Sequence, residues 1–455
     1  MIDPRLLKGF RDYLPDIMIQ KKGLINNLEN IFENYGFSPI NTPALEYSDI
    51  LLGKSGGETE KQIYRFLDQG KRDIALRFDL TVPLARFVSL HFDKLTFPFK
   101  CYHIGPVWRG ENTQKGRFRE FYQCDFDILG TNSIESGLEI LLIIKSGLTN
   151  LNIGDFKINI NNRKIINALL NKMNLTDKSG DILRTIDKIH KIGFDNVLKD
   201  IVDNLKVDLK TAEKLMDFLN INNSNNKILG EISDYNEIYN TMNKLKNNIE
   251  KECWQIIDDT EYIFSAFEAI GIKKYFSYNP AITRGLDYYT GIVFESFIID
   301  QLDFGSICSG GRYDNLTGLY SKNIISGIGG SFGLDRILAL MENKNIQNTK
   351  TSKTDLLILN LDIKNNYNYH LLAENLRSND IKTEIFFDKK KIAVQFKYAE
   401  KKSINFILFA GEDEFKKKRF NIKNIKTGEE NTSLGIEEII KIINKNKMAE
   451  INRQK

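Results

Sequence analysis

Six arginines fall in segments whose sequences read as strands or as glycine-flanked turns. They are Arg77, Arg109, Arg117, Arg119, Arg284 and Arg336. A guanidinium group binds phosphate oxygens through paired hydrogen bonds and stays charged at any working pH, so several converging arginines suit a triphosphate. Each arginine taken singly could instead form an ion pair with a nearby acid such as Asp79, Glu111 or Asp335.

The sequence offers neither a standard phosphate loop nor a metal-binding motif. It has no GxxxxGK[ST], and its run GIGGSFG is only loosely related to GxGxxG, so a tight turn or close packing is an equally good interpretation. The four histidines and four cysteines form no HExxH, CxxC or mixed cluster. We therefore expect no metal site made by the protein alone, and any metal should arrive with a nucleotide.

Composition limits the class of protein. The 455 residues are 42% hydrophobic and 27% charged, which is typical of a globular chain of about two to four domains. The first residues lack the apolar run of a secretory leader, and no run is long enough to span a bilayer, so we expect a cytoplasmic protein. Residues 354–455 hold 20 Lys and Arg against 15 Asp and Glu, while the rest of the chain is slightly acidic. This asymmetry indicates a polyanion-binding tail, although a solvated basic surface would look the same.

The elements that must position these arginines can be predicted from periodicity. Apolar spacing predicts a helix over Ile17–Tyr35 that stops at Gly36. Strand-like runs from Phe99 to Gly110 and from Phe118 to Leu129 flank a polar loop, which predicts a long antiparallel hairpin. Residues 156–274 contain no proline and read as mostly helical, with an Asn-rich joint at 220–226.

The tail after a polar linker at 341–353 has its own pattern. Strand and helix signals alternate from DLLILNL through YHLLAENLRSN, KTEIFF and KIAVQFKYAEKK to NFILFAG. Alternation of this kind predicts a small α/β domain with helices over a largely parallel sheet.

The order of three segments resembles the class II aminoacyl-tRNA synthetases. GFSPINTPALE (Gly36–Glu46) resembles motif 1 with its proline, Pro43. VWRGENTQKGRFREFYQCDFDILG (Val107–Gly130) resembles motif 2, which is strand, Arg-x-Glu, loop and strand. GIGGSFGLDRIL (Gly327–Leu338) resembles motif 3.

Further segments resemble the histidyl-tRNA synthetases in particular. ITRGLDYYTG (Ile282–Gly291) and SGGRYD (Ser309–Asp314) are similar to the two histidine-specific motifs of that family. RFDLTVP (Arg77–Pro83) is similar to its substrate motif in the Asp-Leu-Thr version. The resemblance covers essentially the whole chain, and the tail is similar to the family's anticodon-binding domain.

The resemblance implies an α+β fold: an antiparallel class II sheet flanked by helices, with a helical insertion and a C-terminal α/β anticodon-binding domain. The implied boundaries are 1–155 and 275–345 for the two parts of the catalytic core, 156–274 for the insertion and 354–455 for the anticodon-binding domain. It also implies a homodimer paired through motif 1.

The implied activity is the ligation of histidine to tRNA(His), with ATP converted to AMP and diphosphate through a histidyl-adenylate. Arg109 and Arg284 would hold the α-phosphate as the catalytic pair, and Mg²⁺ would enter with ATP. Nucleotide binding would use Arg109, Glu111, Arg117, Phe121, Arg284 and Arg336. Histidine binding would use Asp79, Leu80, Thr81, Gln123, Asp127, Tyr288 and Tyr289. Asp127 departs from the glutamate of many bacterial relatives and shortens that side chain by one methylene.

The partners implied are histidine, ATP and tRNA(His), without DNA or membrane. In the tail, Phe387 and Lys389–Lys391 are candidates for contacts with unstacked anticodon bases, or else form a solvated charged turn. Two other functions stay open: a catalytically inactive, histidine-sensing regulatory paralogue, and a synthetase-like RNA sensor. The first normally lacks the tail domain, and the second would need a kinase segment that this chain lacks.

Overall fold

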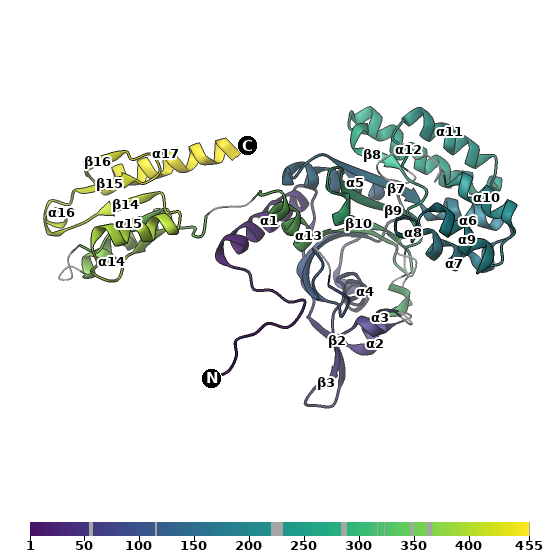
Figure 1. Cartoon of the computed structure of the whole chain (residues 1–455), viewed down its shortest axis with the longest axis horizontal. Coiled ribbons are helices and arrows are strands. Elements are labelled where there is room, and N and C mark those ends of the chain that lie inside the picture. The colour runs from purple at the N-terminus through teal and green to yellow at the C-terminus, as the bar shows by residue number, and fades with distance from the viewer. Residues whose placement is uncertain are drawn as a thin grey trace. The chain divides into compact units, whose positions relative to one another are not determined.

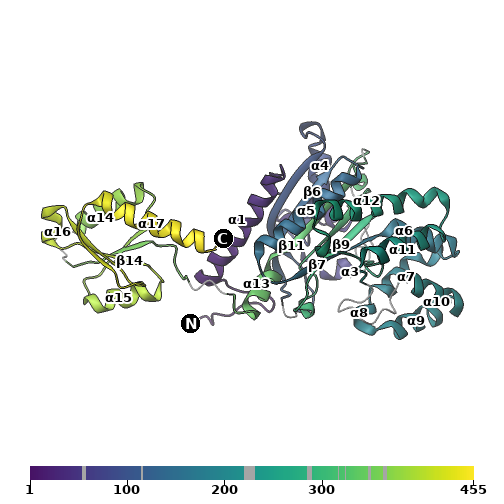
Figure 2. The same cartoon turned by 90° about the horizontal axis from the view of Figure 1, so that it is seen from above.

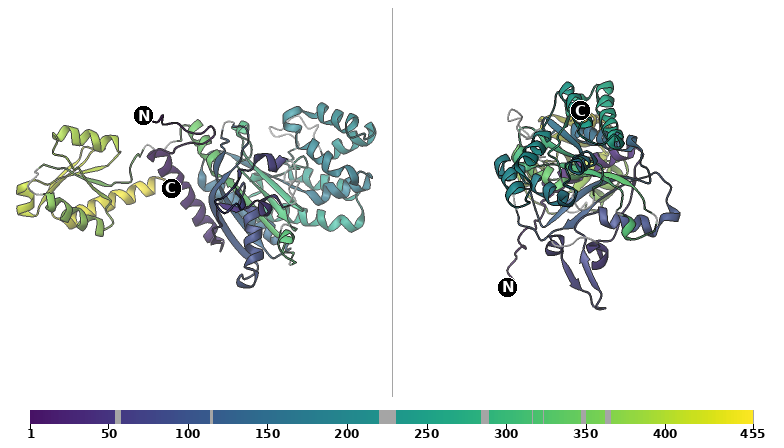
Figure 3. Two further views of the ribbon diagram at one scale, coloured as in Figure 1. Left: turned by 90° about the horizontal axis from the view of Figure 1, so that it is seen from below. Right: turned by 90° about the vertical axis from the view of Figure 1, so that its right-hand side faces the viewer.

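A computed structural model of the chain describes residues 1–53, 58–113, 116–219, 231–283, 289–315, 317–322, 324–346, 350–361 and 366–454. The chain divides into two compact units: residues 1–11 with 24–346, and residues 12–23 with 347–455. Figures 1, 2 and 3 show the elements of both units from four directions. The Asn-rich joint lies outside the described residues.

The centre of the first unit is an eight-stranded sheet in the order β1-β5-β6-β11-β10-β9-β7-β8. Its strands are antiparallel except at the two edges, where β1 runs parallel to β5 and β8 parallel to β7. The bounds are β1 Ser38–Pro39, β5 Phe99–Trp108, β6 Glu120–Leu129, β7 Phe156–Asn162, β8 Phe276–Tyr278, β9 Ile292–Ile298, β10 Cys308–Tyr313 and β11 Gly327–Gly333.

The predicted hairpin is confirmed. Strands β5 and β6 pair without a break in register from Phe99 opposite Leu129 to Trp108 opposite Glu120. β11 then pairs with β6, although the two strands lie some two hundred residues apart in sequence. This pairing brings the segments that resemble motif 2 and motif 3 side by side in the middle of the sheet.

One face of the sheet is covered by helices. The predicted first helix is confirmed as α1 (Pro15–Asn34), and its Phe32 ring stacks on Phe126 of β6 at 5.0 Å between centroids. Helix α5 (Ile134–Leu151) also packs on this face, where a Cβ at Gly147 would come within 2.5 Å of the Phe332 ring. The aromatic and aliphatic contacts on this side leave the opposite face of the strands for the functional site.

A smaller sheet and further helices complete the core. The smaller sheet has the order β2-β4-β3. The bounds are β2 Leu45–Tyr47, β3 Arg65–Leu67, β4 Asp73–Leu76, α2 Ser48–Leu52, α3 Glu58–Gln62, α4 Thr81–Leu90 and α13 Leu334–Asn343. The predicted linker begins too early, because α13 continues to Asn343 and buries Met341 at its end.

The middle of the chain is mostly helical, as the sequence predicts. Its helices are α6 Arg163–Lys172, α7 Ser179–Ile186, α8 Ile189–Ile192, α9 Phe194–Asp203, α10 Leu209–Phe218, α11 Tyr235–Lys246 and α12 Trp254–Ile270. They gather beside the β7–β8 edge of the sheet in Figures 1 and 2. Residues 156–162 are not helical but form β7, since Ile158 and Ile160 pack in the sheet core. The helical part therefore begins after Asn162.

The second unit contains the predicted α/β tail. Its sheet has the order β13-β12-β14-β15-β16, and only β12, β13 and β14 are parallel to one another. The bounds are β12 Leu356–Ile358, α14 Asn366–Ser378, β13 Thr383–Ile385, α15 Ile392–Lys401, β14 Phe406–Phe409, α16 Glu412–Lys417, β15 Phe420–Asn424, β16 Glu430–Leu434 and α17 Ile436–Gln454.

The tail departs from a largely parallel sheet at its last two strands, which are antiparallel. Short polar runs such as ENTSL carry no buried-strand signal, and for that reason β16 is not predicted from its sequence. The apolar side chains of α14 and α17 pack with one face of the sheet, and those of α15 pack with the other. The tail is therefore a three-layer domain with its own core.

Candidate active site

Strand β6 presents a row of functional side chains on one face. Side chains alternate along a strand, so Phe121, Gln123, Asp125 and Asp127 point to the same side. All four line a cavity of about 310 Å³, whereas the intervening Phe126 packs against α1 on the other face. One strand thus supplies an aromatic ring, an amide and two carboxylates in a line.

Glycines in the strands beside β6 leave space for this cavity above the sheet. Gly329 of β11 lies opposite Asp127, and a Cβ there would overlap the Asp127 carboxylate. Gly310 of β10 lies against the backbone of β11 so closely that any side chain would collide with it. The glycines that resemble a loop in the sequence therefore lie in strands, where they leave room for the carboxylate and for a ligand.

Three of the six arginines line the cavity: Arg109, Arg117 and Arg336. Arg109 donates from Nε to the carbonyl oxygen of Phe78 at 2.8 Å, and its guanidinium lies 5.2 Å from the centre of the Phe121 ring. Arg336 donates to the carbonyl oxygen of Ser306. Arg117 lies 3.8 Å from the carboxylate of Glu111, which also lines the cavity.

Arg77 and Arg119 have structural roles instead. Arg77 is buried and donates to the carbonyl oxygens of Thr42 at 2.7 Å and Pro106 at 2.9 Å, which ties the segment of motif 1 to β5. Arg119 donates to the carbonyl oxygen of Glu111 at 3.3 Å. Neither of these two arginines lines the cavity. Their hydrogen bonds go mainly to backbone carbonyls, and Arg77 also contacts the Thr42 hydroxyl and the His103 ring. Arg284 lies outside the described residues.

The start of α4 contributes a second wall. Asp79 is buried, and its Oδ1 accepts a hydrogen bond from the backbone N–H of Val82 at 3.0 Å. Asp79 and Thr81 line the cavity, while Leu80 is buried at the helix start. Tyr289 lines the cavity from the far side, and its carbonyl oxygen accepts a hydrogen bond from Arg163 at 2.6 Å. Tyr288 lies outside the described residues.

Three buried carboxylates of the cavity, Asp79, Asp125 and Asp127, lie in an environment that disfavours their charge. Burial is the largest cause in each case, and it raises the pKa of Asp79, raises that of Asp125 well above its usual value and raises that of Asp127 to about 7. Asp127 also adds to the shift of Asp125, while the Arg109 guanidinium lowers the pKa of both Asp79 and Asp125. The hydroxyl of Tyr313 donates to Asp127 Oδ1 at 2.7 Å and lowers the pKa of Asp127. A ligand that carries positive charge would relieve the repulsion.

The structure brings most of the predicted site residues together. Those that line the one cavity are Asp79, Thr81, Arg109, Glu111, Arg117, Phe121, Gln123, Asp127, Tyr289 and Arg336. The roles predicted for them stay predictions.

The lining residues that the sequence prediction missed include Asp125, Glu295, Tyr313 and Ser331. Strand alternation between Gln123 and Asp127 was a signal that could have found Asp125. No comparable signal existed for Glu295 or Ser331, because the sequence does not say which strands lie beside β6.

Two absences concern the described residues alone. They include no group of three or more His, Cys, Asp and Glu side chains that could hold a metal ion. They also include no helix with the length and apolar character needed to cross a bilayer.

Family models match both parts of the chain. Residues 9–337 match the model described as Histidyl-tRNA synthetase, and residues 355–446 match that of an Anticodon binding domain. The curated relative from Treponema denticola, a Histidine--tRNA ligase, is 46% identical over 93% of this chain and 94% of its own length. One from Clostridium tetani with the same name is 39% identical over 97% of this chain and 98% of its own length.

Solved structures agree. The histidyl-tRNA synthetase from Nostoc sp. covers 98% of this chain and 100% of its own, with a TM-score of 0.84 and 28% identity. A protein from Bacillus halodurans described as an ATP phosphoribosyltransferase regulatory subunit/histidyl-tRNA synthetase has a TM-score of 0.70 at 20% identity, over 87% of this chain and 96% of its own. That second likeness shows a shared fold and does not favour a regulatory role. With a matching family model over most of its length and relatives of high identity along nearly all of it, this chain belongs to the histidyl-tRNA synthetase family.

Proposed function

We propose that the cavity beside β6 activates histidine with ATP and then transfers the histidyl group to the 3′-terminal adenosine of tRNA(His). The observation that carries this proposal is the single row of side chains on β6. Phe121 begins the row beside Arg109, and Asp127 ends it beside Tyr313. A nucleotide and a histidine laid end to end along the strand would each meet suitable groups.

In the first step the histidine carboxylate attacks the α-phosphorus of ATP and displaces diphosphate. Negative charge grows on the phosphate oxygens, and fixed cations lower the barrier. Arg109 would hold the α-phosphate, with Arg284 as its partner on the other side. The hydrogen bond from Arg109 to Phe78 supports this role, because a guanidinium held in place before the reaction need not reorganise during it.

Four other residues that line the cavity would make the remaining contacts with the nucleotide. Arg117 and Arg336 would bind the β- and γ-phosphates. Phe121 would stack on the adenine, and Glu111 would accept a hydrogen bond from the adenine amino group. Mg²⁺ would enter bound to the phosphates of ATP and would add positive charge there.

Histidine needs acceptors for its α-ammonium group and partners for two imidazole nitrogens. Asp79, Thr81 and Gln123 would bind the ammonium group, with Leu80 placing the first two at the start of α4. Asp127, Tyr288 and Tyr289 would form the imidazole pocket. In the second step we assign proton removal from the tRNA hydroxyl to the adenylate phosphate or to another group of the substrate itself.

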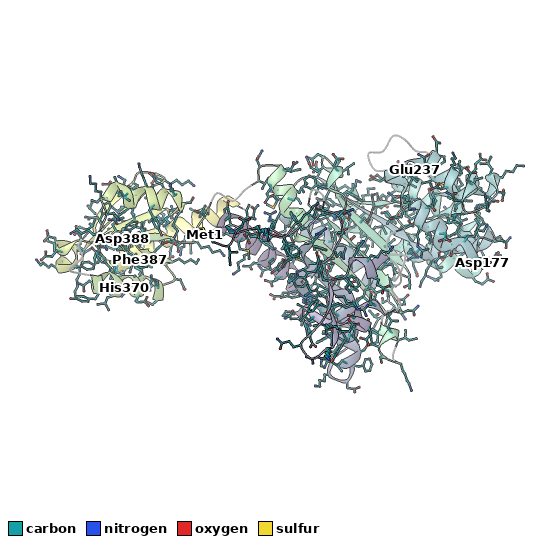
Figure 4. All side chains as sticks on the ribbon, turned by 60° about the horizontal axis from the view of Figure 1, so that its bottom comes forward. Met1, Asp177, Glu237, His370, Phe387 and Asp388 are labelled. Carbon is teal, nitrogen blue, oxygen red and sulfur yellow. The ribbon has the colours of Figure 1, made fainter. Side chains whose placement is uncertain are left out.

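The tail would read the anticodon of tRNA(His). Phe387 is 82% exposed, and it is followed by the exposed Lys389, Lys390 and Lys391. Asn360 donates to the carbonyl oxygen of Phe387 at 2.8 Å, and the buried Gln395 donates to that of Lys390 at 2.9 Å. Buried amide side chains thus hold the backbone of this loop, while an aromatic ring and three lysines are exposed. Such a surface can bind unstacked bases. Figure 4 labels Phe387, Asp388 and His370 on the tail unit.

The active form would be a cytoplasmic homodimer. The small sheet and α4 leave large apolar side chains exposed: Leu45 43%, Tyr47 53%, Phe66 46%, Leu67 67% and Leu90 68%. Clustered exposed apolar groups of this kind are typical of a protein interface. Sedimentation analysis should give a dimer, and Leu67→Asp should shift the protein toward the monomer.

Amino-acid-dependent exchange between ATP and diphosphate tests the proposal directly. The protein is incubated with ATP, labelled diphosphate and each amino acid in turn. Histidine alone should support exchange, and tRNA(His) should then accept the amino acid. Binding of histidine without any exchange would instead favour the regulatory alternative.

A further inference from the structure

Two buried acceptor atoms on the cavity wall have no hydrogen-bond partner among the described residues. They are Oε1 of Gln123 and Oδ1 of Asp125. The two side chains are two residues apart on β6, so they share a face and lie roughly 7 Å apart at the backbone. Both line the cavity. A buried acceptor is costly unless something donates to it, so the pair indicates a ligand that carries several N–H groups.

Ser331 of β11 fixes the direction of both side chains. It lies opposite Asp125 in the register, and its Oγ accepts a hydrogen bond from Nε2 of Gln123 at 3.2 Å. The Ser331 side chain also forms a hydrogen bond with Asp125, and its hydroxyl hydrogen is the donor there, since a carboxylate can only accept. The amide nitrogen of Gln123 is thereby occupied, and its oxygen is left for the cavity.

The charge of this region calls for a cation. Asp125 faces two further carboxylates, Asp79 and Asp127. Two described cations lie near it: Arg109, which lines the cavity, and Arg77, which is bonded to backbone carbonyls and does not line it. Burial and the neighbouring carboxylates raise the pKa of Asp125 well above its usual value. An ammonium group supplies a positive charge and three N–H donors, which matches the carboxylate of Asp79 and the two acceptor atoms without partners.

We infer that Asp125 is a further histidine-binding residue, and that it joins Asp79, Thr81 and Gln123 around the α-ammonium group. Ser331 is the positioning residue that aims Gln123 and Asp125 at that group. The inference rests on the proposed function, because it takes histidine as the ligand. It adds to that function a reason for the cavity to prefer histidine over an imidazole compound that lacks the ammonium group.

The experiment compares two ligands on the full-length protein. L-Histidine and 3-(imidazol-4-yl)propionate share the imidazole and the carboxylate, but only histidine carries the ammonium group. Asp125→Asn should weaken histidine binding about 10- to 100-fold by calorimetry, as expected for loss of a hydrogen bond to a charged group. Binding of the propionate should change less than about twofold, because it makes no contact with Asp125.

Ser331→Ala should lower the ratio of histidine affinity to propionate affinity, and Ser331→Thr should restore it, since threonine keeps the hydroxyl. The control is Glu139→Gln, which removes a carboxylate that bonds Lys100 of β5 outside the cavity and should leave the ratio unchanged. Equal weakening of both ligands in Asp125→Asn, or no weakening of either, overturns the inference. Absence of histidine-dependent exchange in the unaltered protein would instead overturn the proposed function.

Discussion

At the scale of single residues, the site is a row of side chains on β6 that ends in two carboxylates, with Arg109 beside the other end of the row. The arginine end, with Arg109 held by the carbonyl oxygen of Phe78, is built for phosphate. The carboxylate end, with Asp125 and Asp127 buried, is built for a cation. Each end has a property that a single substitution can change.

Replacement of Arg109 with lysine should lower histidine-dependent exchange by about 100-fold or more, the usual loss when a fixed donor to a transition-state oxyanion is removed. Lysine keeps the charge but lacks the planar fork in which Nε bonds Phe78 while the terminal nitrogens face a phosphate. Initial exchange rates at saturating ATP would measure the loss. The control is Arg119→Lys, in which a backbone-bonding arginine of the same hairpin changes and exchange should fall by less than about threefold. Equal loss in both variants would remove Arg109 from the mechanism.

Histidine affinity should rise with pH between about 6 and 8 because of Asp127. Burial raises the pKa of this carboxyl from 3.8 to about 7, with Asp79 adding to the shift and Tyr313 opposing it. Histidine binding favours the ionised form, so protons compete with the ligand below the pKa and cease to do so above it. Tyr313→Phe removes the opposing donor and should move the midpoint upward.

Calorimetric titrations of histidine at several pH values would provide the profile. Free histidine itself titrates in this range, so the profile of Asp127→Asn must be subtracted. A difference profile that is flat from pH 6 to 8 would contradict the assignment of Asp127 to the imidazole pocket.

At the scale of elements, the cavity depends on strands that carry glycine where most strands carry bulky residues. β11 has Gly329 opposite Asp127, and β10 has Gly310 against β11. The helical insertion also contributes, since Thr283 donates to the carbonyl oxygen of Leu183 in α7 and Arg163 at the start of α6 donates to Tyr289. Both ends of the histidine motif are thus attached to the insertion.

Gly329→Ala should abolish histidine binding and lower the melting temperature by several degrees, because the added methyl group overlaps the Asp127 carboxylate and a tightly packed site cannot yield without strain. Calorimetric titration and thermal unfolding would measure the two effects. The control is Gly23→Ala in α1, where nothing lies within 4 Å of the added Cβ. Helix propensity predicts a neutral or slightly stabilising change there. Wild-type histidine affinity in Gly329→Ala would show that this strand does not form the floor of the site.

At the scale of the whole molecule, activation and tRNA selection fall to different units. The first unit holds the complete cavity in so far as the described residues form it. The second has a core on each face of its own sheet and carries the exposed turn at Phe387. Changes on the tail surface should therefore affect one step and leave the other intact.

Phe387→Ala should lower kcat/KM for tRNA(His) by about 5- to 100-fold, the range expected when one base loses its aromatic partner, while exchange stays the same. Aminoacylation and exchange assays on the same preparation would separate the two steps. Tyr367→Ala is the control, because Tyr367 is another exposed aromatic residue of the tail, 68% accessible, outside the proposed turn. Parallel losses in the two variants would mean that the turn has no special part in tRNA binding.

The chain by itself determined the local elements and the identity of part of the cavity lining. Periodicity predicted α1, the β5–β6 hairpin and the helical middle, and the resemblance named ten residues that now line one cavity. These features depend on neighbours in sequence: the alternation of side chains in a strand and the turn of a helix are local geometry.

Only the tertiary structure decided which face of each strand became a cavity and which became core. Arg77 and Arg119 look like Arg109 in sequence, yet only Arg109 of the three lines the cavity. Asp125 lies beside Ser331, which belongs to a strand distant in sequence. The burial of the carboxylates, their raised pKa values and the space above Gly329 all come from such distant pairings. They depend on which segments meet, and no local pattern contains that information.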